Sequence, residues 1–207
     1  MPRAGPEELR LFFAIPLAEE LRDRAVELQR ELDRAGAKVK WVARPNLHMT
    51  LKFIGEVAAD RLRDFCGVAA QVAASARGCE LTVGGVGCFR SRGTPRTIWL
   101  GAQGDTPALA ELAASLDAAL AQAGLAEPER REFVAHFTLG RVKSGRKARE
   151  LLAAIDALAA APVGPMAVDR FVLMSSELTP EGPAYTEEAT FGLGPRTAKV
   201  GRRVNNA

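Results

Sequence analysis

Hydrophobic residues along the chain recur in two patterns, the two-residue repeat of strands and the three-to-four-residue repeat of helices. Strands are predicted at residues 11–15, 46–55, 80–89, 97–101, 132–142, 166–175 and 184–191. Helices are predicted at residues 17–35, 58–76, 106–123 and 146–161. Glycine follows three of these helices, at Gly36, Gly78 and Gly124, as expected where a helix ends.

The order of predicted elements occurs twice in the chain. Corresponding elements are separated by roughly 86 to 89 residues, which predicts an internal duplication. Alternation of strands and helices is also common in unrelated mixed proteins, so the order alone is weak evidence. Identity between the two halves is low except in one short motif, which is therefore the informative part.

That motif contains the only two histidines of the chain. His48 lies in the segment NLHMTL and His136, 88 residues later, lies in VAHFTL. Each is followed two residues on by a threonine, Thr50 and Thr138. Side chains at positions i and i+2 of a strand point to the same face, so each histidine should project together with its threonine. The alternate positions, predicted to face the core, are Leu47, Met49, Leu51 and Phe53 in the first strand and Phe133, Ala135, Phe137 and Leu139 in the second.

Two matched histidines indicate general acid–base chemistry at a phosphate. If the halves pack about a pseudo-two-fold axis, the two His–Thr pairs face each other across a cleft. One neutral imidazole can then accept a proton from water while the other, protonated, donates to a leaving oxygen. Threonine hydroxyls can hydrogen-bond the phosphate oxygens. A single histidine on a strand is more often structural, but two in matching contexts favour catalysis.

Composition places the chain among ordinary globular proteins. Its 207 residues are 47% hydrophobic, enough for one large domain or two closely packed lobes. No apolar run approaches the length of a membrane span, and the charged, proline-containing N-terminus lacks the apolar core of a signal peptide. Cys66, Cys79 and Cys88 are odd in number and lack paired spacing, which favours free thiols and a cytoplasmic location.

The net charge of +3 is concentrated at the C-terminal end. Residues 194–207 contain Arg196, Lys199, Arg202 and Arg203 and no acidic residue, so the rest of the chain carries a net charge of −1. Such a basic end is typical of a flexible tail, and a weak tether for nucleic acid is the alternative.

Other kinds of site have little support. A catalytic zinc ion needs three suitable protein ligands, which two histidines on separate strands and scattered cysteines do not readily supply. A Cys–His nucleophile pair is not excluded, but no cysteine lies in a recognisable context. The glycine cluster at residues 84–87 lacks the lysine and helix start of a phosphate-binding loop and indicates a bulged strand or turn.

At its paired H-x-T-x motifs the chain resembles the two-histidine (2H) phosphoesterase superfamily. It is most similar to the RNA 2′,3′-cyclic phosphodiesterases, also called LigT-like or 2′-5′ RNA ligase-like proteins. The resemblance runs from about residue 11 to residue 191. It includes the segments RLFFAI at 10–15, Trp41 with Asn46 before the first histidine, PRTIW at 95–99, and the residues from Ser175 to Tyr185.

The resemblance implies an α+β fold of two pseudo-symmetric lobes, with antiparallel sheets lining a central cleft and helices outside. We expect one domain over residues 1–193, with lobes at about 10–90 and 96–175, a closing strand near 184–191 and a tail at 194–207. The implied reaction is metal- and cofactor-independent hydrolysis of an RNA terminal 2′,3′-cyclic phosphate to a 2′-phosphate. His48 maps onto the proton donor and His136 onto the proton acceptor, with Thr50 and Thr138 at the phosphate. Proline commonly precedes the second histidine in this family, whereas this chain has Ala135.

Three further residues are candidates for substrate binding. Arg141, five residues after His136, is either a phosphate-binding cation or a surface residue. Strict alternation would put it on the opposite face from His136, so a bend near Gly140 would be needed. Phe13 and Tyr185 either stack on a base or belong to the core. Arg44 and Arg130 are weaker candidates, more simply explained as solvated charges.

Two alternatives to hydrolysis remain at this stage. The same site could perform reversible 2′-5′ RNA ligation, or the protein could bind RNA ends or nucleotides without turnover. The expected partner is an RNA 3′ end, such as that of a tRNA fragment, or a nucleotide cyclic phosphate. No membrane is expected as a partner, and the protein is expected to be a monomer.

Overall fold

The computed structural model describes residues 8–179 and 182–195. The strands in this part of the chain are β1 (Glu8–Pro16), β2 (Val39–Trp41), β3 (His48–Ala58), β4 (Cys79–Ser91), β5 (Thr94–Gly104), β6 (His136–Val142), β7 (Pro162–Val168), β8 (Arg170–Thr179) and β9 (Gly182–Gly192). The helices are α1 (Glu19–Asp33), α2 (Leu62–Ser75), α3 (Thr106–Gln122) and α4 (Ala148–Ala157), with short 3₁₀ turns η1 (Arg44–Asn46) and η2 (Ala59–Arg61).

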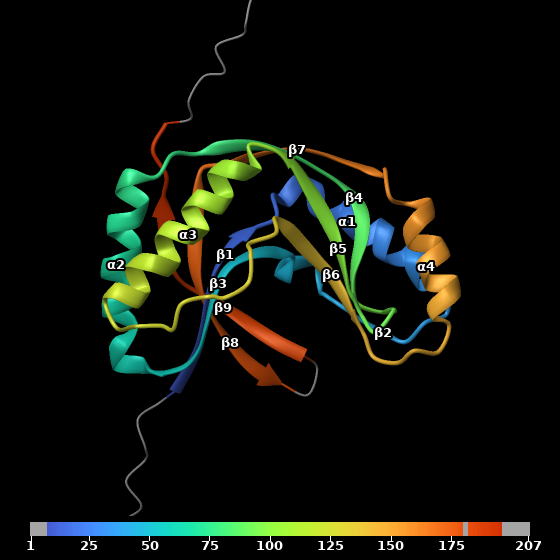
Figure 1. The fold of residues 1–207 in the computed structure, drawn as a ribbon, viewed down its shortest axis with the longest axis horizontal. Helices are drawn as coiled ribbons and strands as arrows, with labels where there is room; N and C mark the ends of the chain where they lie inside the picture. The colour runs from blue at the N-terminus through green and yellow to red at the C-terminus, as the bar shows by residue number, and fades with distance from the viewer. Residues whose placement is uncertain (1–7, 180–181, 196–207) are drawn as a thin grey trace, which may run out of the picture.

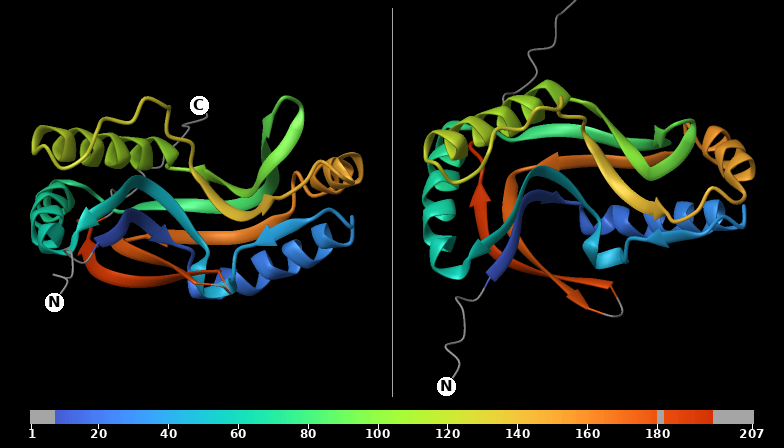
Figure 2. Two further views of the ribbon diagram at one scale, coloured as in Figure 1. Left: turned by 90° about the horizontal axis from the view of Figure 1, so that it is seen from below. Right: turned by 60° about the horizontal axis from the view of Figure 1, so that its bottom comes forward.

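The strands form two antiparallel sheets. One has the order β3-β1-β8-β9 and the other the order β2-β6-β5-β4-β7. Figure 1 shows α2 and α3 at one end of the molecule and α1 and α4 at the other, with the strands between them. The two further views show both sheets curving between these helical ends (Figure 2). The predicted α+β class with antiparallel sheets and outer helices is confirmed.

Both halves of the sequence contribute to each sheet. The strand trio β3-β1-β8 in one sheet has the same arrangement as the trio β6-β5-β4 in the other. In the predicted repeat β1 corresponds to β5, β3 to β6, and β4 to β8. The third strand of each half therefore pairs with strands of the other half, and the histidine strands β3 and β6 occupy corresponding positions.

Several predicted boundaries differ from the structure. The predicted strand 132–142 begins only at His136, where its pairing with Gly101 of β5 starts. The predicted strand 166–175 is divided into β7 and β8, and β2 is not among the predicted strands. Within residues 8–179 and 182–195, every helix falls short of what is needed to span a bilayer. Most of the basic segment 194–207 lies outside the described residues.

A bulge reverses the expected alternation along β3. Ala14 of β1 pairs with Thr50, but the next residue, Phe13, pairs with Lys52, so Leu51 is an extra residue in β3. The faces of the next two residues, Lys52 and Phe53, are therefore inverted relative to strict alternation, and a second irregularity follows between Phe53 and Gly55. The prediction that Phe53 faces the core is therefore wrong: Phe53 is 50% exposed, whereas Lys52 is only 6% exposed.

The other predicted core positions agree better with the structure. Fully buried or nearly so are Leu47, Met49, Leu51, Phe137 and Leu139. Phe133 and Ala135 are partly buried and pack against the main core. Those within the strands, Met49, Leu51, Phe137 and Leu139, lie opposite the histidine-bearing face, so hydrophobic burial on one side orients the polar motif on the other.

The buried Lys52 ammonium joins β3 to the segment that leads into β6. Its Nζ donates to Asp117 Oδ1 of α3 at 2.5 Å and to the carbonyl oxygen of Glu127 at 2.6 Å. The Asp117 carboxylate also accepts a hydrogen bond from the Glu129 backbone N–H at 3.0 Å. Burying an ammonium is unfavourable unless it is paired, and here a carboxylate and a carbonyl oxygen compensate it. One ion pair therefore fixes the course of the chain shortly before His136.

Replacing Asp117 with alanine should leave this ammonium buried without its counter-ion. We expect Asp117→Ala to lower the free energy of unfolding by at least about 2 kcal/mol, measured by urea denaturation. Asp64→Ala, which removes the exposed pair with Arg61, serves as the control and should cost less than about 1 kcal/mol. Equal effects of the two substitutions would contradict a stabilising role for the buried pair.

Candidate active site

The two histidines begin two contacting strands from different sheets, β3 and β6. His48 and His136 are both partly buried. Each ring is held in the same way, because His48 Nδ1 lies 2.8 Å from the carbonyl oxygen of Asn46 and His136 Nδ1 lies 2.7 Å from that of Val134. A carbonyl oxygen only accepts, so Nδ1 carries the proton in both rings. Nε2 is then left to accept a proton in the neutral ring or donate one in the charged ring.

The surroundings lower the pKa of both histidines below the ordinary value of 6.5. Burial is the main cause for each, and the positive charge of Arg141 acts in the same direction. The hydrogen bonds to Asn46 and Val134 oppose this shift, and for His48 the charge of His136 adds to it. Both rings are therefore mainly neutral near pH 7 when no anion is bound.

The threonines lie on the same faces as the histidines. In the four-stranded sheet His48 pairs with Pro16 and Thr50 with Ala14, so both motif residues share a face with alternate residues of β1. In the five-stranded sheet His136 pairs with Gly101 and Thr138 with Trp99. All four motif residues are partly exposed, and their shared faces agree with the i, i+2 spacing.

A bulge in β6 brings Arg141 to the same face as His136. Trp99 of β5 pairs with Thr138, but its neighbour Ile98 pairs with Gly140, so Leu139 is an extra residue in β6. Arg141 then pairs with Thr97, which points to the same face as Trp99. The bend that the sequence left open is therefore present, and the charge of Arg141 acts on both histidines.

Glycine is required at the position next to this bulge. A Cβ atom on Gly140 would lie 2.7 Å from Cε3 of the Trp41 ring and 2.7 Å from Cγ1 of Val39. Trp41 is the direct partner of Gly140 in the β2–β6 pairing. The ring therefore packs on the glycine backbone, and a larger residue would push β2 away from β6 beside Arg141.

Aromatic residues surround both histidines, but not all of those predicted. The Phe12 and Tyr185 rings lie 5.0 Å and 5.5 Å from the His48 ring, and Phe89 lies 4.9 Å from the His136 ring. Phe13 is 0% exposed and packs against other core rings, so it belongs to the core and not to a base-stacking surface. Sequence reasoning missed Phe12 and Phe89; the alternation of β1 relative to β3 was the signal for Phe12.

The remaining predicted cations lie elsewhere or are already paired. Arg44 contacts Glu19 at 2.5 Å and Asp23 at 2.6 Å, so its charge is largely neutralised within the protein. Arg130 is exposed in the segment between α3 and β6. Of the three arginines considered from the sequence, Arg141 is the one whose charge acts on the histidines.

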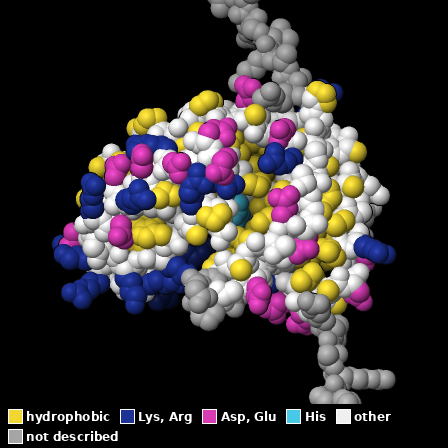
Figure 3. All heavy atoms as spheres, turned by 180° about the vertical axis from the view of Figure 1, so that it is seen from behind, with side chains coloured by type: hydrophobic (Ala, Val, Ile, Leu, Met, Phe, Trp, Pro, Cys, Tyr) yellow, Lys and Arg dark blue, Asp and Glu magenta, His cyan; other side chains and the backbone are white. Residues whose placement is uncertain are grey.

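A hollow surrounds the histidine pair. Figure 3 shows a histidine side chain at the bottom of a hollow on the face opposite to that of Figure 1, with hydrophobic side chains beside it. A groove of about 330 Å³ lies beside it, and its lining includes Asn46, Arg141 and Tyr185. The Asn46 side chain closes one end by donating to the carbonyl oxygen of Pro183 at 3.1 Å.

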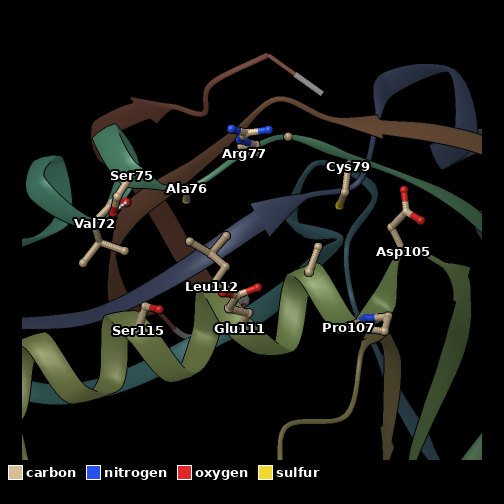
Figure 4. A pocket seen from close by; sticks show the side chains of 12 residues that line it. Val72, Ser75, Ala76, Arg77, Cys79, Asp105, Pro107, Glu111, Leu112 and Ser115 are labelled. Carbon is tan, nitrogen blue, oxygen red and sulfur yellow. Dashed lines mark hydrogen bonds between the residues drawn. The ribbon is translucent and has the colours of Figure 1, made fainter. Parts of the chain in front are cut away.

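A larger cavity of about 670 Å³ lies away from the histidines, between the end of α2 and the start of α3. Figure 4 shows Arg77 on one side of it and Glu111 of α3 on the other, with Asp105 near Cys79. Its lining contains no histidine, and two carboxylates would repel a phosphate. In the part of the chain that the structure describes, no group of three or more His, Cys, Asp or Glu could hold a metal ion.

The histidine pKa values provide a direct test of this geometry. With two histidines in the chain, an NMR titration should show two ring signals, both with midpoints below 6.5. Arg141→Gln should raise both midpoints because it removes a nearby positive charge. Arg63→Gln on α2 is the control and should leave them unchanged. A midpoint above 6.5 in the wild type would contradict the described environment.

The same shift predicts how stability depends on pH. The unfolded chain takes up protons at its histidines near pH ~6.5, whereas the folded protein does so only at lower pH. The contribution of these neutral rings is therefore fully present above pH ~6.5 and is lost as the pH falls through the folded values. Urea unfolding between pH 7 and pH 5 should show this decrease, and replacing both histidines with glutamine should reduce it.

Comparison with known proteins identifies the family. The family described as LigT like Phosphoesterase matches twice in succession, over residues 15–99 and 100–185. The chain is 38% identical to an RNA 2′,3′-cyclic phosphodiesterase of Methanothermobacter thermautotrophicus over 186 residues, which cover 90% of this chain and 100% of that protein. It is 36% identical to the protein of the same description from Thermotoga maritima, over 86% of this chain and 91% of that protein.

Solved structures give the same result. The apo form of E. coli LigT matches with a TM-score of 0.70 and 30% identity, covering 91% of this chain and 99% of LigT. A Thermus thermophilus protein, TT0787, matches with a TM-score of 0.71 and 29% identity, covering 91% of this chain and 100% of TT0787. The resemblance found in the paired histidine motifs is confirmed, and this chain belongs to the family of LigT-like phosphoesterases.

Proposed function

We propose that this protein hydrolyses the terminal 2′,3′-cyclic phosphate of RNA to a 2′-phosphate and a free 3′ hydroxyl. The observation that carries the proposal is the matched pair of histidines, each with its Nδ1 proton donated to a backbone carbonyl and with Arg141 beside both. The relatives described as RNA 2′,3′-cyclic phosphodiesterases support it. The structure of E. coli LigT complexed with 3′-AMP supports a nucleotide ligand.

In this mechanism the two histidines have complementary roles. Neutral His136 accepts a proton at Nε2 from water as the water oxygen attacks phosphorus. The bond between phosphorus and the ribose O3′ breaks, and protonated His48 donates from Nε2 to that oxygen. The assignment of His48 as donor and His136 as acceptor follows the order of the family motifs. No metal ion is needed in this scheme, because both proton transfers use imidazole.

Substrate binding should raise the pKa of His48 and so increase the fraction of molecules in which its ring is protonated. In the unliganded protein its pKa is lowered, chiefly by burial, so few molecules carry the required proton at neutral pH. A phosphate anion between the rings favours the charged form of histidine and raises this pKa again. Donor competence is thereby coupled to the presence of the anion that is to be cleaved.

The neighbouring polar side chains would bind the phosphate. Thr50 and Thr138 share faces with the histidines, and their hydroxyls can donate to the non-bridging oxygens. The Arg141 guanidinium can form two parallel hydrogen bonds to the same group and offset the charge that develops during attack. Tyr185, half-buried against His48, would contact the terminal nucleoside.

We further propose that residues 1–193 act as one catalytic unit of two related halves, and that the protein works as a cytoplasmic monomer. The cysteines Cys66, Cys79 and Cys88 are all free thiols, in keeping with a reducing compartment.

Cleavage of a short RNA ending in a 2′,3′-cyclic phosphate, in the presence of EDTA, tests the function. Wild type should produce a 2′-phosphate end, and His48→Ala and His136→Ala should each lower kcat at least about 100-fold. Absence of turnover by the wild type, with RNA still bound, would contradict the proposal and favour a binding protein.

A second substrate separates the two histidine roles. A nitrophenyl phosphodiester has a leaving group that departs without protonation, so the loss caused by His48→Ala should shrink on this substrate. The loss caused by His136→Ala should persist, because water must still be deprotonated. The reverse pattern would exchange the assigned roles. Arg63→Ala, a surface change on α2, is the matched control and should behave like the wild type on both substrates.

A further inference from the structure

Two positive side chains lie directly opposite each other at the edge of the five-stranded sheet. Lys40 of β2 is the register partner of Arg141 of β6. Directly paired residues of antiparallel strands point to the same face, so Lys40 projects on the side of the sheet that carries His136 and Thr138. Like charges in this arrangement are destabilising. The pair therefore has a cost that an anion between or beside them would remove.

No acidic side chain in the described residues compensates this pair. Many other basic residues have an acidic partner: Arg22, Arg24, Arg44, Lys52, Arg61, Arg131, Lys147 and Arg170. Within residues 8–179 and 182–195, neither Lys40 nor Arg141 belongs to a salt bridge. Both side chains are exposed. Other described cations, Arg63 among them, also lack a salt bridge, so what distinguishes Lys40 and Arg141 is that two such cations are direct partners across a strand pair.

The groove beside the histidines links this pair to His48. Lys40 and Arg141 both line it, together with the aromatic residues Trp41 and Tyr185. No Asp or Glu occurs among the described residues of its lining. Tyr185 contacts the His48 ring at one end, and Lys40 lies one strand farther out than Arg141. Figure 3 shows that many Lys and Arg side chains, interspersed with Asp and Glu, lie on one half of this face.

We propose that Lys40 binds a second RNA phosphate, the phosphodiester that joins the terminal nucleotide to the preceding one. This inference rests on the proposed function and adds to it a binding site for a second phosphate of the same RNA. Arg141 binds the reacting cyclic phosphate. The groove between Lys40 and Tyr185 binds the RNA nucleotide that precedes the terminal one. The preferred substrate is then an oligonucleotide end and not a free cyclic mononucleotide.

The test compares a cyclic mononucleotide with a dinucleotide that ends in the same cyclic nucleotide. The quantity measured is the ratio of kcat/KM for the dinucleotide to kcat/KM for the mononucleotide. Lys40→Ala should lower this ratio about fivefold, mainly through KM of the dinucleotide, since a single exposed charge–phosphate contact is lost. The dependence of dinucleotide binding on salt should weaken by about one phosphate contact. Lys40→Arg should restore the ratio.

The control and the outcomes separate this inference from the proposed function. Arg63→Ala also removes one exposed positive charge, on α2, and should leave the ratio unchanged. If wild type cleaves both substrates and Lys40→Ala leaves the ratio unchanged, the second phosphate site is overturned while the proposed function stands. If wild type cleaves neither substrate, the proposed function fails. An equal fall of the ratio in Arg63→Ala would indicate a general charge effect and would overturn the specific contact.

Discussion

The register between β5 and β6 is the constraint on which the site depends. One extra residue, Leu139, lets β6 keep its hydrophobic side chains in the core while Thr138 and Arg141 both point to the histidine face. Without it, Arg141 would point to the face opposite the histidines. The bulge is supported from the neighbouring strand, where Trp41 packs on the backbone of Gly140. The bulge at Leu139 thus determines both the packing of β2 on β6 and the face on which Arg141 lies.

The same face shows how burial and charge are balanced. Hydrophobic surroundings and Arg141 lower the pKa of both imidazoles, which favours a proton acceptor but opposes a proton donor. In the proposed mechanism, an anionic substrate raises the pKa of the donor again. Lys40 and Arg141 are direct partners across β2 and β6, and no Asp or Glu occurs among the described residues that line the groove. The positive charge at this place is therefore not neutralised by the lining. The electrostatics of the unliganded protein are therefore complementary to a phosphate.

Away from this face, two basic residues near the histidine strands serve the fold. Lys52 is buried because the bulge at Leu51 turns it inward, and its pair with Asp117 secures the segment that precedes His136. Arg44, which precedes His48 by four residues, is paired with Glu19 and Asp23 of α1. Both histidine strands are thus approached by chain that ion pairs hold in place.

The sequence by itself determined the features that follow from local geometry. Side chains two residues apart on a strand share a face, so it could be predicted that His48 projects with Thr50 and His136 with Thr138. The core residues Met49 and Phe137 could be predicted in the same way. Only the tertiary structure decided which residue lies across from which. Register and bulges depend on contacts between distant strands, and a shift of one residue inverts a face. For this reason Lys52 is buried and Phe53 is exposed, contrary to strict alternation. For the same reason Phe12, and not Phe13, contacts His48, and Arg141 lies on the histidine face with Lys40 as its partner.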